Sequence, residues 1–256
     1  MFTQAEAYGR FMGRYGQELG TKLADFAGVA PGMRALDVGC GPGALTSVLT
    51  GRLGADRVAG ADPSEPFVEA NRARNPGVEL VVARAENLPF PDDAFDAALS
   101  QLVVNFMRDP KAGVAEMARV IKPGGVAAAC VWDYRGKMTM LRAFWDAGRE
   151  VDPEGATAAD EARETWSDDE LAELWHAVGL EDVRTRGLTV SASYTDFEDL
   201  WSPFAAGIGP AGAYCLSLDD ARRAELYEAY RRRLGVGDDP FELTALAWAV
   251  AGTVGG

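Results

Sequence analysis

Three glycines alternate with other residues immediately after a short apolar run that contains an aspartate. The segment reads Asp37-Val38-Gly39-Cys40-Gly41-Pro42-Gly43, and a helical pattern begins near Ala44. Glycine allows sharp turns and lets a ligand approach the main chain, while the first turn of a helix offers N–H groups without partners in the helix. The segment therefore predicts a ligand-binding loop. A tight turn that binds nothing is the alternative.

The charge of Asp37 indicates which ligand the loop binds. Its carboxylate lies two residues before Gly39, where it is unfavourable beside a pyrophosphate but suits a cationic sulfonium or ammonium group. The glycine spacing is also Gly-x-Gly-x-Gly, whereas the dinucleotide fingerprint is Gly-x-Gly-x-x-Gly. We therefore expect a cationic ligand. The alternative for Asp37 is a local cap of the turn or helix.

Two further acidic residues follow the next two apolar runs. Asp62 ends the second run, where a carboxylate can accept hydrogen bonds from both hydroxyls of a ribose. Glu86 follows the third run and can accept from an adenine amino group while Leu88 packs against the ring. Both have plainer alternatives, because Asp62 can cap the helix predicted to begin at 63–66 and Glu86 can be a solvated loop charge.

Apolar runs and helical patterns alternate over the first half of the chain. Runs without polar alternation predict strands that are covered on both faces, as in a parallel sheet. We therefore predict an α/β fold with a doubly wound, Rossmann-like, mostly parallel sheet. The predicted strands are 35–38, 58–61, 78–82, 97–99 and 126–132, and the predicted helices between them are 45–53, 66–74 and 111–120. An amphipathic N-terminal helix, with apolar residues at three- and four-residue steps from Tyr8 to Phe26, precedes them.

The pattern changes after Asp133. Ser167 and Glu170 predict a helix start, 219–234 predicts a helix, and 188–192 with 243–250 predict an antiparallel pair of strands at the sheet edge. We expect one domain over 1–256, with a cap helix in 1–28 and a cofactor-binding core in 30–135. Segments 136–166 and 197–235 are expected to be helical insertions on the substrate side. Their aromatic residues indicate either an apolar organic acceptor or lid packing; these are Phe144, Trp145, Trp201, Phe204 and Tyr214.

Composition excludes several classes of function. The net charge of −14 disfavours nucleic acid as a partner, because binding to phosphates depends on Lys and Arg. Three widely separated cysteines form neither a disulfide framework nor a metal knuckle, and no metal site is expected. The first residues lack the basic and apolar regions of a signal peptide, and no apolar run approaches the ~20 residues of a membrane span. We expect a cytoplasmic protein that does not bind membranes; monomer and homodimer both stay open.

Five motifs together resemble the class I S-adenosylmethionine-dependent methyltransferases. They fall in the same order along residues 30–135 as in that family. They are Asp37–Gly43 with its three glycines, the position of Asp62, Ala85-Glu86-Asn87-Leu88-Pro89-Phe90, Phe95-Asp96, and Lys122-Pro123-Gly124-Gly125. We expect the last of these motifs, residues 122–125, to form a structural turn that leads into the fifth strand.

The resemblance implies S-adenosylmethionine as cofactor and a small organic acceptor. It implies that the cofactor contacts Asp37, Gly39, Gly41, Gly43, Asp62, Pro63, Ala85, Glu86 and Gln101. The N-terminal segment is similar to the cap helix of a bacterial small-molecule branch. By that likeness Tyr8, Arg14 and Tyr15 close over the cofactor, with Arg14 near its carboxylate.

Methyl transfer from a sulfonium needs alignment more than a catalytic group, so no obligatory catalytic residue is expected. If the acceptor is a hydroxyl, a base would help, and the candidates are Asp133, Tyr134 and His176. Two other functions stay open from sequence. One is a nucleoside-binding protein without activity on the same fold, and the other is a nicotinamide-dependent oxidoreductase.

Overall fold

The structure is a computed structural model that describes residues 11–160 and 166–256. The chain divides into two compact units. The sheet unit comprises residues 16–132, 166–188 and 247–256, and the described part of the helical unit comprises residues 11–15, 133–160 and 189–246.

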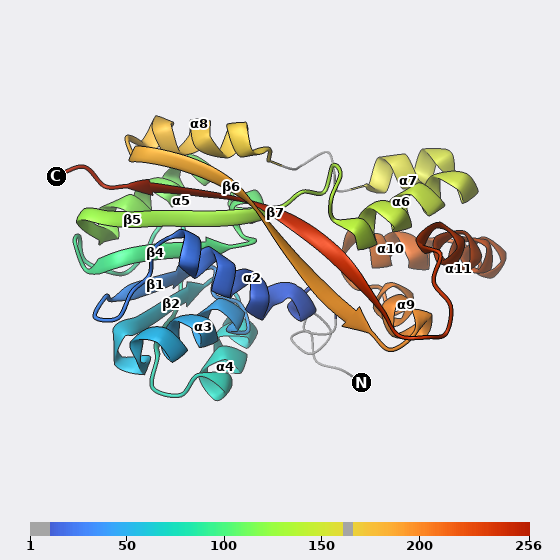
Figure 1. Cartoon of the computed structure of the whole chain (residues 1–256), viewed down its shortest axis with the longest axis horizontal. Helices are drawn as coiled ribbons and strands as arrows, with labels where there is room; N and C mark the ends of the chain where they lie inside the picture. The colour runs from blue at the N-terminus through green and yellow to red at the C-terminus, as the bar shows by residue number, and fades with distance from the viewer. Residues whose placement is uncertain (1–10, 161–165) are drawn as a thin grey trace. The chain divides into compact units, whose positions relative to one another are not determined.

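Within the described residues, seven strands form one sheet in the order β3-β2-β1-β4-β5-β7-β6 (Figure 1). β1 pairs in parallel with both β2 and β4, β2 with β3, and β4 with β5, whereas β7 runs antiparallel to β5. The strands are β1 (Ala35–Val38), β2 (Val58–Asp62), β3 (Glu79–Val82), β4 (Phe95–Gln101), β5 (Ile121–Trp132), β6 (Glu181–Tyr194) and β7 (Phe241–Thr253). The predicted doubly wound, mostly parallel sheet is therefore confirmed.

Helices cover both faces of the sheet, as the alternation along β1 shows. Leu36 and Val38 pack into a hydrophobic cluster that includes residues of α5 and α8, whereas Asp37, between them, bonds to Thr46 on α3. Successive side chains of a strand point to opposite faces, so α3 lies on one face and α5 with α8 on the other. The helices of this unit are α2 (Gly13–Phe26, from residue 16 onward), α3 (Ala44–Leu53), α4 (Glu65–Arg74), α5 (Pro110–Val120) and α8 (Asp168–Val178).

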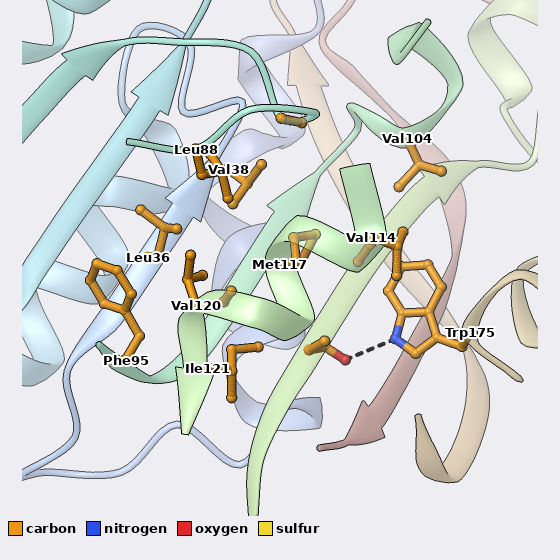
Figure 2. Close-up of a cluster of buried hydrophobic side chains, with 14 of the residues drawn as sticks. Leu36, Val38, Leu88, Phe95, Val104, Val114, Met117, Val120, Ile121 and Trp175 are labelled. Atoms are coloured by element: carbon orange, nitrogen blue, oxygen red, sulfur yellow. Dashed lines mark hydrogen bonds between the residues drawn. The ribbon is translucent and has the colours of Figure 1, made fainter. Parts of the chain in front are cut away.

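The hydrophobic cluster fixes the strands that carry the glycine-rich loop. Figure 2 shows Leu36 and Val38 of β1 beside Leu88, with Val114 and Met117 projecting from α5. Trp175 of α8 closes the same cluster, and its indole Nε1–H donates to the main-chain oxygen of Ala127 at 3.0 Å (Figure 2). This bond satisfies the one polar atom that the indole brings into the core.

Aromatic rings form the core of the helical unit. Phe144 stacks on Phe204 with ring centroids 4.4 Å apart, and both side chains are fully buried. Trp145, Trp201 and Tyr214 are also buried, so these five aromatic residues pack the unit itself. The helices of this unit are α6 (Thr139–Val151), α7 (Pro153–Ala159), α9 (Phe197–Ala205), α10 (Gly209–Ser217) and α11 (Asp220–Leu234).

Two local expectations need correction. The segment 122–125, expected to be a turn, lies inside β5, because Gly124 N–H donates to Val254 O and Gly125 O accepts from Val254 N–H. The edge strand expected at 188–192 extends over Glu181–Tyr194. The predicted helix start is confirmed, because Ser167 and Glu170 form a reciprocal capping box at α8. Among the described residues, no helix combines the length and apolar character that crossing a bilayer requires.

Candidate functional site

The three glycines of the loop after β1 differ in what surrounds them. All three have positive φ, at 74° for Gly39, 49° for Gly41 and 93° for Gly43. A Cβ placed at Gly39 would lie 2.4 Å from Val103 Cγ2, and one at Gly43 would lie 2.4 Å from Asn71 Oδ1. At Gly41 nothing lies within 4 Å of that position. Gly39 and Gly43 are therefore closed in by the protein, whereas Gly41 faces open space that a ligand can occupy.

Asp37 lies at the base of this loop with one carboxylate oxygen unpaired. Oδ2 accepts a hydrogen bond from Thr46 Oγ1 at 2.6 Å, whereas Oδ1 is buried and has no partner. Burial raises the pKa of Asp37 to about 7, and the nearby charge of Asp62 adds to the rise, while the Thr46 hydroxyl opposes it. A buried carboxylate without a counter-charge is unfavourable, so this oxygen favours a cationic donor.

Thr46 is a site residue that sequence reasoning missed. Its hydroxyl donates to Asp37 and accepts from Asn71 Nδ2 at 2.9 Å, and Asn75 Nδ2 donates to Asn71 Oδ1 at 2.8 Å. This buried network runs from β1 through α3 to α4 and fixes which way the Asp37 carboxylate faces. A hydroxyl in the first turn of α3 was the available signal, but the sequence does not show which side chain it meets.

Asp62, at the end of β2, is hydrogen-bonded to the glycine-rich loop. Its Oδ2 accepts from Gly41 N–H at 2.9 Å, and its Oδ1 accepts from Ser64 N–H at 2.8 Å. Burial raises the pKa of Asp62, and these two main-chain donors oppose the rise. Each oxygen keeps a second lone pair for a ligand hydroxyl. Pro63, between Asp62 and Ser64, is exposed to solvent.

Glu86 connects the loop after β3 to the loop after β4. Its Oε1 accepts from Arg108 N–H at 2.7 Å and from Asp109 N–H at 3.4 Å. Partial burial alone would raise the pKa of Glu86, but main-chain hydrogen bonds from residues 86, 108 and 109 and the charge of Arg84 bring it below its usual value. Ala85 is buried beside it, and Leu88 is buried within the hydrophobic cluster of Figure 2. Glu86 therefore has a structural task, and its contact with adenine stays a prediction.

Gln101 ends β4 on the same face of the sheet as Asp37. Asp37 is in register with Leu99, and Gln101 lies two residues further along that strand. Its Nε2 donates to Gly16 O of α2 at 2.9 Å, whereas its Oε1 is buried without a partner. The site thus holds two unsatisfied acceptors on neighbouring strands.

The cap-helix candidates lie in the helical unit. Arg14 forms a two-point ion pair with the Asp199 carboxylate, with Nη1 2.8 Å from Oδ2, and its guanidinium lies 4.7 Å from the centre of the Tyr194 ring. The hydroxyls of Tyr15 and Tyr194 are 3.2 Å apart, and burial raises the pKa of Tyr15 far above its usual value. Tyr8 lies outside the described residues. Closure of these residues over the cofactor stays a prediction.

The three candidate bases have different surroundings. Asp133 accepts main-chain N–H groups of Gly136 at 3.1 Å and Lys137 at 3.2 Å, so its carboxylate caps the turn after β5. Tyr134 follows it and accepts from Arg142 Nη1 through its main-chain oxygen at 3.0 Å. His176 is exposed in the last turn of α8, in the sheet unit. No structural feature distinguishes any of the three as the base.

Comparisons with known proteins agree on one family. A family model described as a methyltransferase domain matches residues 36–129. A demethylmenaquinone methyltransferase of Corynebacterium kroppenstedtii is 35% identical over 170 residues, which cover 62% of this chain and 72% of that protein. The enzyme of the same name from Clavibacter sepedonicus is 34% identical over 184 residues, covering 66% of this chain and 74% of its own length.

Solved structures share the fold at low sequence identity. The crystal structure of the 4+2 cyclase SpnF matches 94% of this chain and 82% of its own, with a TM-score of 0.58 and 20% identity. This similarity concerns the fold only, because one fold supports different chemistries.

Proposed function

The chain belongs to the class I S-adenosylmethionine-dependent methyltransferases, and we propose that its cofactor binds over the glycine-rich loop at the carboxyl ends of β1, β2 and β4. The enzyme transfers a methyl group from S-adenosylmethionine to a small organic acceptor. Ligands of open α/β sheets bind beyond the carboxyl ends of the strands, where the strand order reverses. In this sheet β1 lies at that reversal, between β2 and β4.

The unpaired Oδ1 of Asp37 is the observation that carries the proposed site. A cationic ligand with an ammonium group would satisfy it, and Gln101 Oε1 offers a second buried acceptor. S-adenosylmethionine carries both an ammonium and a sulfonium, so its positive charge fits these two acceptor oxygens. The open space at Gly41 supplies room beside the main chain.

The remaining cofactor contacts follow from the ends of β2 and β3. We assign the ribose hydroxyls to the free lone pairs of Asp62, beside Pro63. We assign the adenine to Ala85 and Glu86, since they follow β3 and Glu86 keeps one carboxylate oxygen outside its bonds to residues 108 and 109. Gly39 and Gly43 shape the loop.

When bound, S-adenosylmethionine supplies a methyl group activated by the positive sulfur. The protein's task is to orient acceptor and cofactor and to exclude water; such positioning can be worth roughly 7–11 kcal/mol of barrier. Asp37 and Asp62 hold the cofactor's charged and polar groups. Arg14 and Tyr15 are proposed to close the site together with Tyr8. A base from among Asp133, Tyr134 and His176 is needed only if the acceptor is a hydroxyl.

Charge and cysteine chemistry support narrower statements about partners and location. The net charge of −14 supports a small molecule rather than nucleic acid as acceptor. Cys40, Cys130 and Cys215 are free, buried thiols, which supports a reducing, cytoplasmic location. A homodimer stays a prediction to which no surface is assigned.

Asp62 variants test the ribose assignment. Asp62→Ala is expected to weaken binding of S-adenosylmethionine at least tenfold, about 1.4 kcal/mol, in calorimetric titration. Asp62→Asn keeps one acceptor oxygen for the loop and should lose less. Unchanged affinity in Asp62→Ala, with a native circular dichroism spectrum, would remove Asp62 from the site. Methyl transfer from labelled cofactor to a panel of small acceptors separates the enzyme from a nucleoside-binding protein without activity.

A further inference from the structure

The loop between β4 and α5, residues 102–109, lies directly on the glycine-rich loop. It is called the β4–α5 loop below. Leu102 begins it with a φ of 64°, an unfavourable value for a leucine, and its N–H donates to Cys130 O at 2.8 Å. The next residue, Val103, occupies the space that a Cβ on Gly39 would need, with Cγ2 2.4 Å from that position. Backbone strain of this kind concentrates at functional sites.

Two apolar side chains anchor the same loop in the sheet unit. Val104 is fully buried. It belongs to the hydrophobic cluster that Figure 2 shows. Met107 is packed against that cluster, and its sulfur lies 2.5 Å from where a Cβ on Gly113 would be. Together with Val103 on Gly39, these contacts fix the short 3-10 turn Val104–Phe106 from both sides.

Glu86 holds the far end of the β4–α5 loop. Its Oε1 accepts the main-chain N–H groups of Arg108 and Asp109, and Asp109 then caps α5 by accepting from Ala112 N–H at 3.0 Å. A carboxylate that accepts two main-chain donors forms charge-assisted bonds, which are stronger than those of a neutral acceptor. Glu86 therefore fixes the end of the β4–α5 loop that leads into α5.

Phe106 is exposed although its neighbours are fixed. Its side chain is 73% exposed, and it is the only aromatic among the three large hydrophobic residues that are exposed in the described part of the chain. The other two are Val82 and Leu216. Because the turn is anchored at Val103, Val104 and Met107, this exposure is a property of a defined conformation. The loop that carries this exposed ring contacts the glycine-rich loop through Val103, three residues earlier.

We propose that Phe106 forms a wall of the acceptor site that packs on a planar, apolar part of the acceptor, and that Glu86 positions it through the β4–α5 loop. This rests on the cofactor site proposed above. Phe106 touches the acceptor, whereas Glu86 acts through the loop. An aromatic face on such a wall favours flat rings, because offset stacking adds to the burial of apolar area. The acceptor class is then a small aromatic compound.

Binding of two matched probes tests this proposal. 1-Naphthol is planar, and decahydro-1-naphthol has the same carbon skeleton without a planar ring. In protein saturated with S-adenosylhomocysteine, the wild type should bind 1-naphthol at least fivefold more tightly than the saturated probe. Phe106→Ala should weaken 1-naphthol at least tenfold and the saturated probe less than threefold. Leu216→Ala, which removes another exposed apolar side chain, should change neither.

Glu86 variants separate positioning from direct contact. In protein saturated with S-adenosylhomocysteine, Glu86→Ala loses the acceptor for both main-chain donors and should weaken binding of 1-naphthol about fivefold. Glu86→Gln keeps an acceptor oxygen and should recover wild-type affinity within twofold. Equal loss in both variants would overturn the positioning role.

Three other results would overturn the role of Phe106. They are no saturable binding of 1-naphthol to the wild type, unchanged affinity in Phe106→Ala, and equal affinity of the wild type for both probes. The proposed function is checked separately by uptake of S-adenosylhomocysteine alone, which Phe106→Ala should change less than twofold. Lack of that uptake in the wild type would overturn both proposals. Normal uptake together with unchanged binding of 1-naphthol by Phe106→Ala would overturn only the proposed role of Phe106.

Discussion

The hydroxyl of Thr46 donates to Oδ2 of Asp37 at 2.6 Å and leaves Oδ1 of the same carboxylate buried without a partner. The fold thus satisfies Oδ2 of the carboxylate, whereas Oδ1 can accept a hydrogen bond from a ligand. Burial raises the pKa of Asp37 to about 7, so near neutral pH the ligand-free protein holds this group partly protonated. A ligand that brings a positive charge to Oδ1 removes this unfavourable state.

The stability of the ligand-free protein should therefore depend on pH through Asp37. Its pKa is raised from 3.8 in the unfolded chain to about 7 in the folded protein, so the folded state binds the proton more tightly. The resulting stability is fully present below pH 3.8 and is lost as the pH rises through 7. Asp37→Asn lacks this loss, and its melting temperature should exceed that of the wild type more at pH 8.5 than at pH 5.5. An equal difference at the two pH values, in thermal melts followed by circular dichroism, contradicts this account.

Cofactor affinity should also follow the ionisation of Asp37. The ionised carboxylate attracts the cationic ligand, so the affinity for S-adenosylmethionine should rise from pH 5.5 toward pH 7 and level off above it. Calorimetric titrations across this range measure the profile. Asp37→Asn is the control, and it should bind more weakly with a flatter profile. A wild-type affinity that is the same at pH 5.5 and pH 8 would show that Asp37 does not meet the charge.

A methyl group at Gly41 should block the ligand more than it harms the fold. Gly41 and Gly235 both have positive φ, and at neither does any atom lie within 4 Å of the position of a Cβ. Gly235 ends α11 in the helical unit, so Gly235→Ala is a matched control for backbone strain. Gly41→Ala and Gly235→Ala should lose similar stability, about 1 kcal/mol. Only Gly41→Ala should lose affinity for S-adenosylhomocysteine, by tenfold or more; wild-type affinity in this variant would place the ligand elsewhere.

Gly39 should tolerate no side chain at all. Gly39→Ala adds left-handed strain and drives a Cβ into Val103, so we expect a loss of about 2 kcal/mol or more in urea unfolding. Gly51→Ala is the opposite case, because Gly51 is exposed within α3 and has nothing within 4 Å of its Cβ position. That substitution should raise stability by about 0.5–1 kcal/mol. The prediction fails if the two variants unfold at the same urea concentration.

The sequence predicted the elements that carry a clear hydrophobic signal. The first strand was predicted at 35–38 and observed at Ala35–Val38, and the helix predicted at 219–234 is observed at Asp220–Leu234. The first half of β6 was missed because charged residues dominate it and its side chains are mostly exposed. Such an edge strand has no apolar pattern to detect, since its pairing comes from the main chain.

Residue types in the candidate site were readable from sequence, but their partners were not. The sequence predicted that Asp37 and Glu86 are acidic groups near a ligand. That Asp37 bonds to Thr46, and that Glu86 bonds to the main chain of Arg108, 22 residues away, depends on how the loops fold over the sheet. For the aromatic residues of the insertions, the sequence left the role open and the structure shows the partners. Their types indicated either an acceptor pocket or packing, and in the structure they are the buried core of the helical unit.

The site at Asp37 is tested most directly by calorimetric titration of the wild type and of Asp37→Asn with S-adenosylmethionine at pH 8. The account predicts saturable uptake of about one ligand per chain by the wild type and an affinity at least tenfold lower in the variant, which should stay folded. Equal affinity in the two proteins, or no uptake by the wild type, would contradict it.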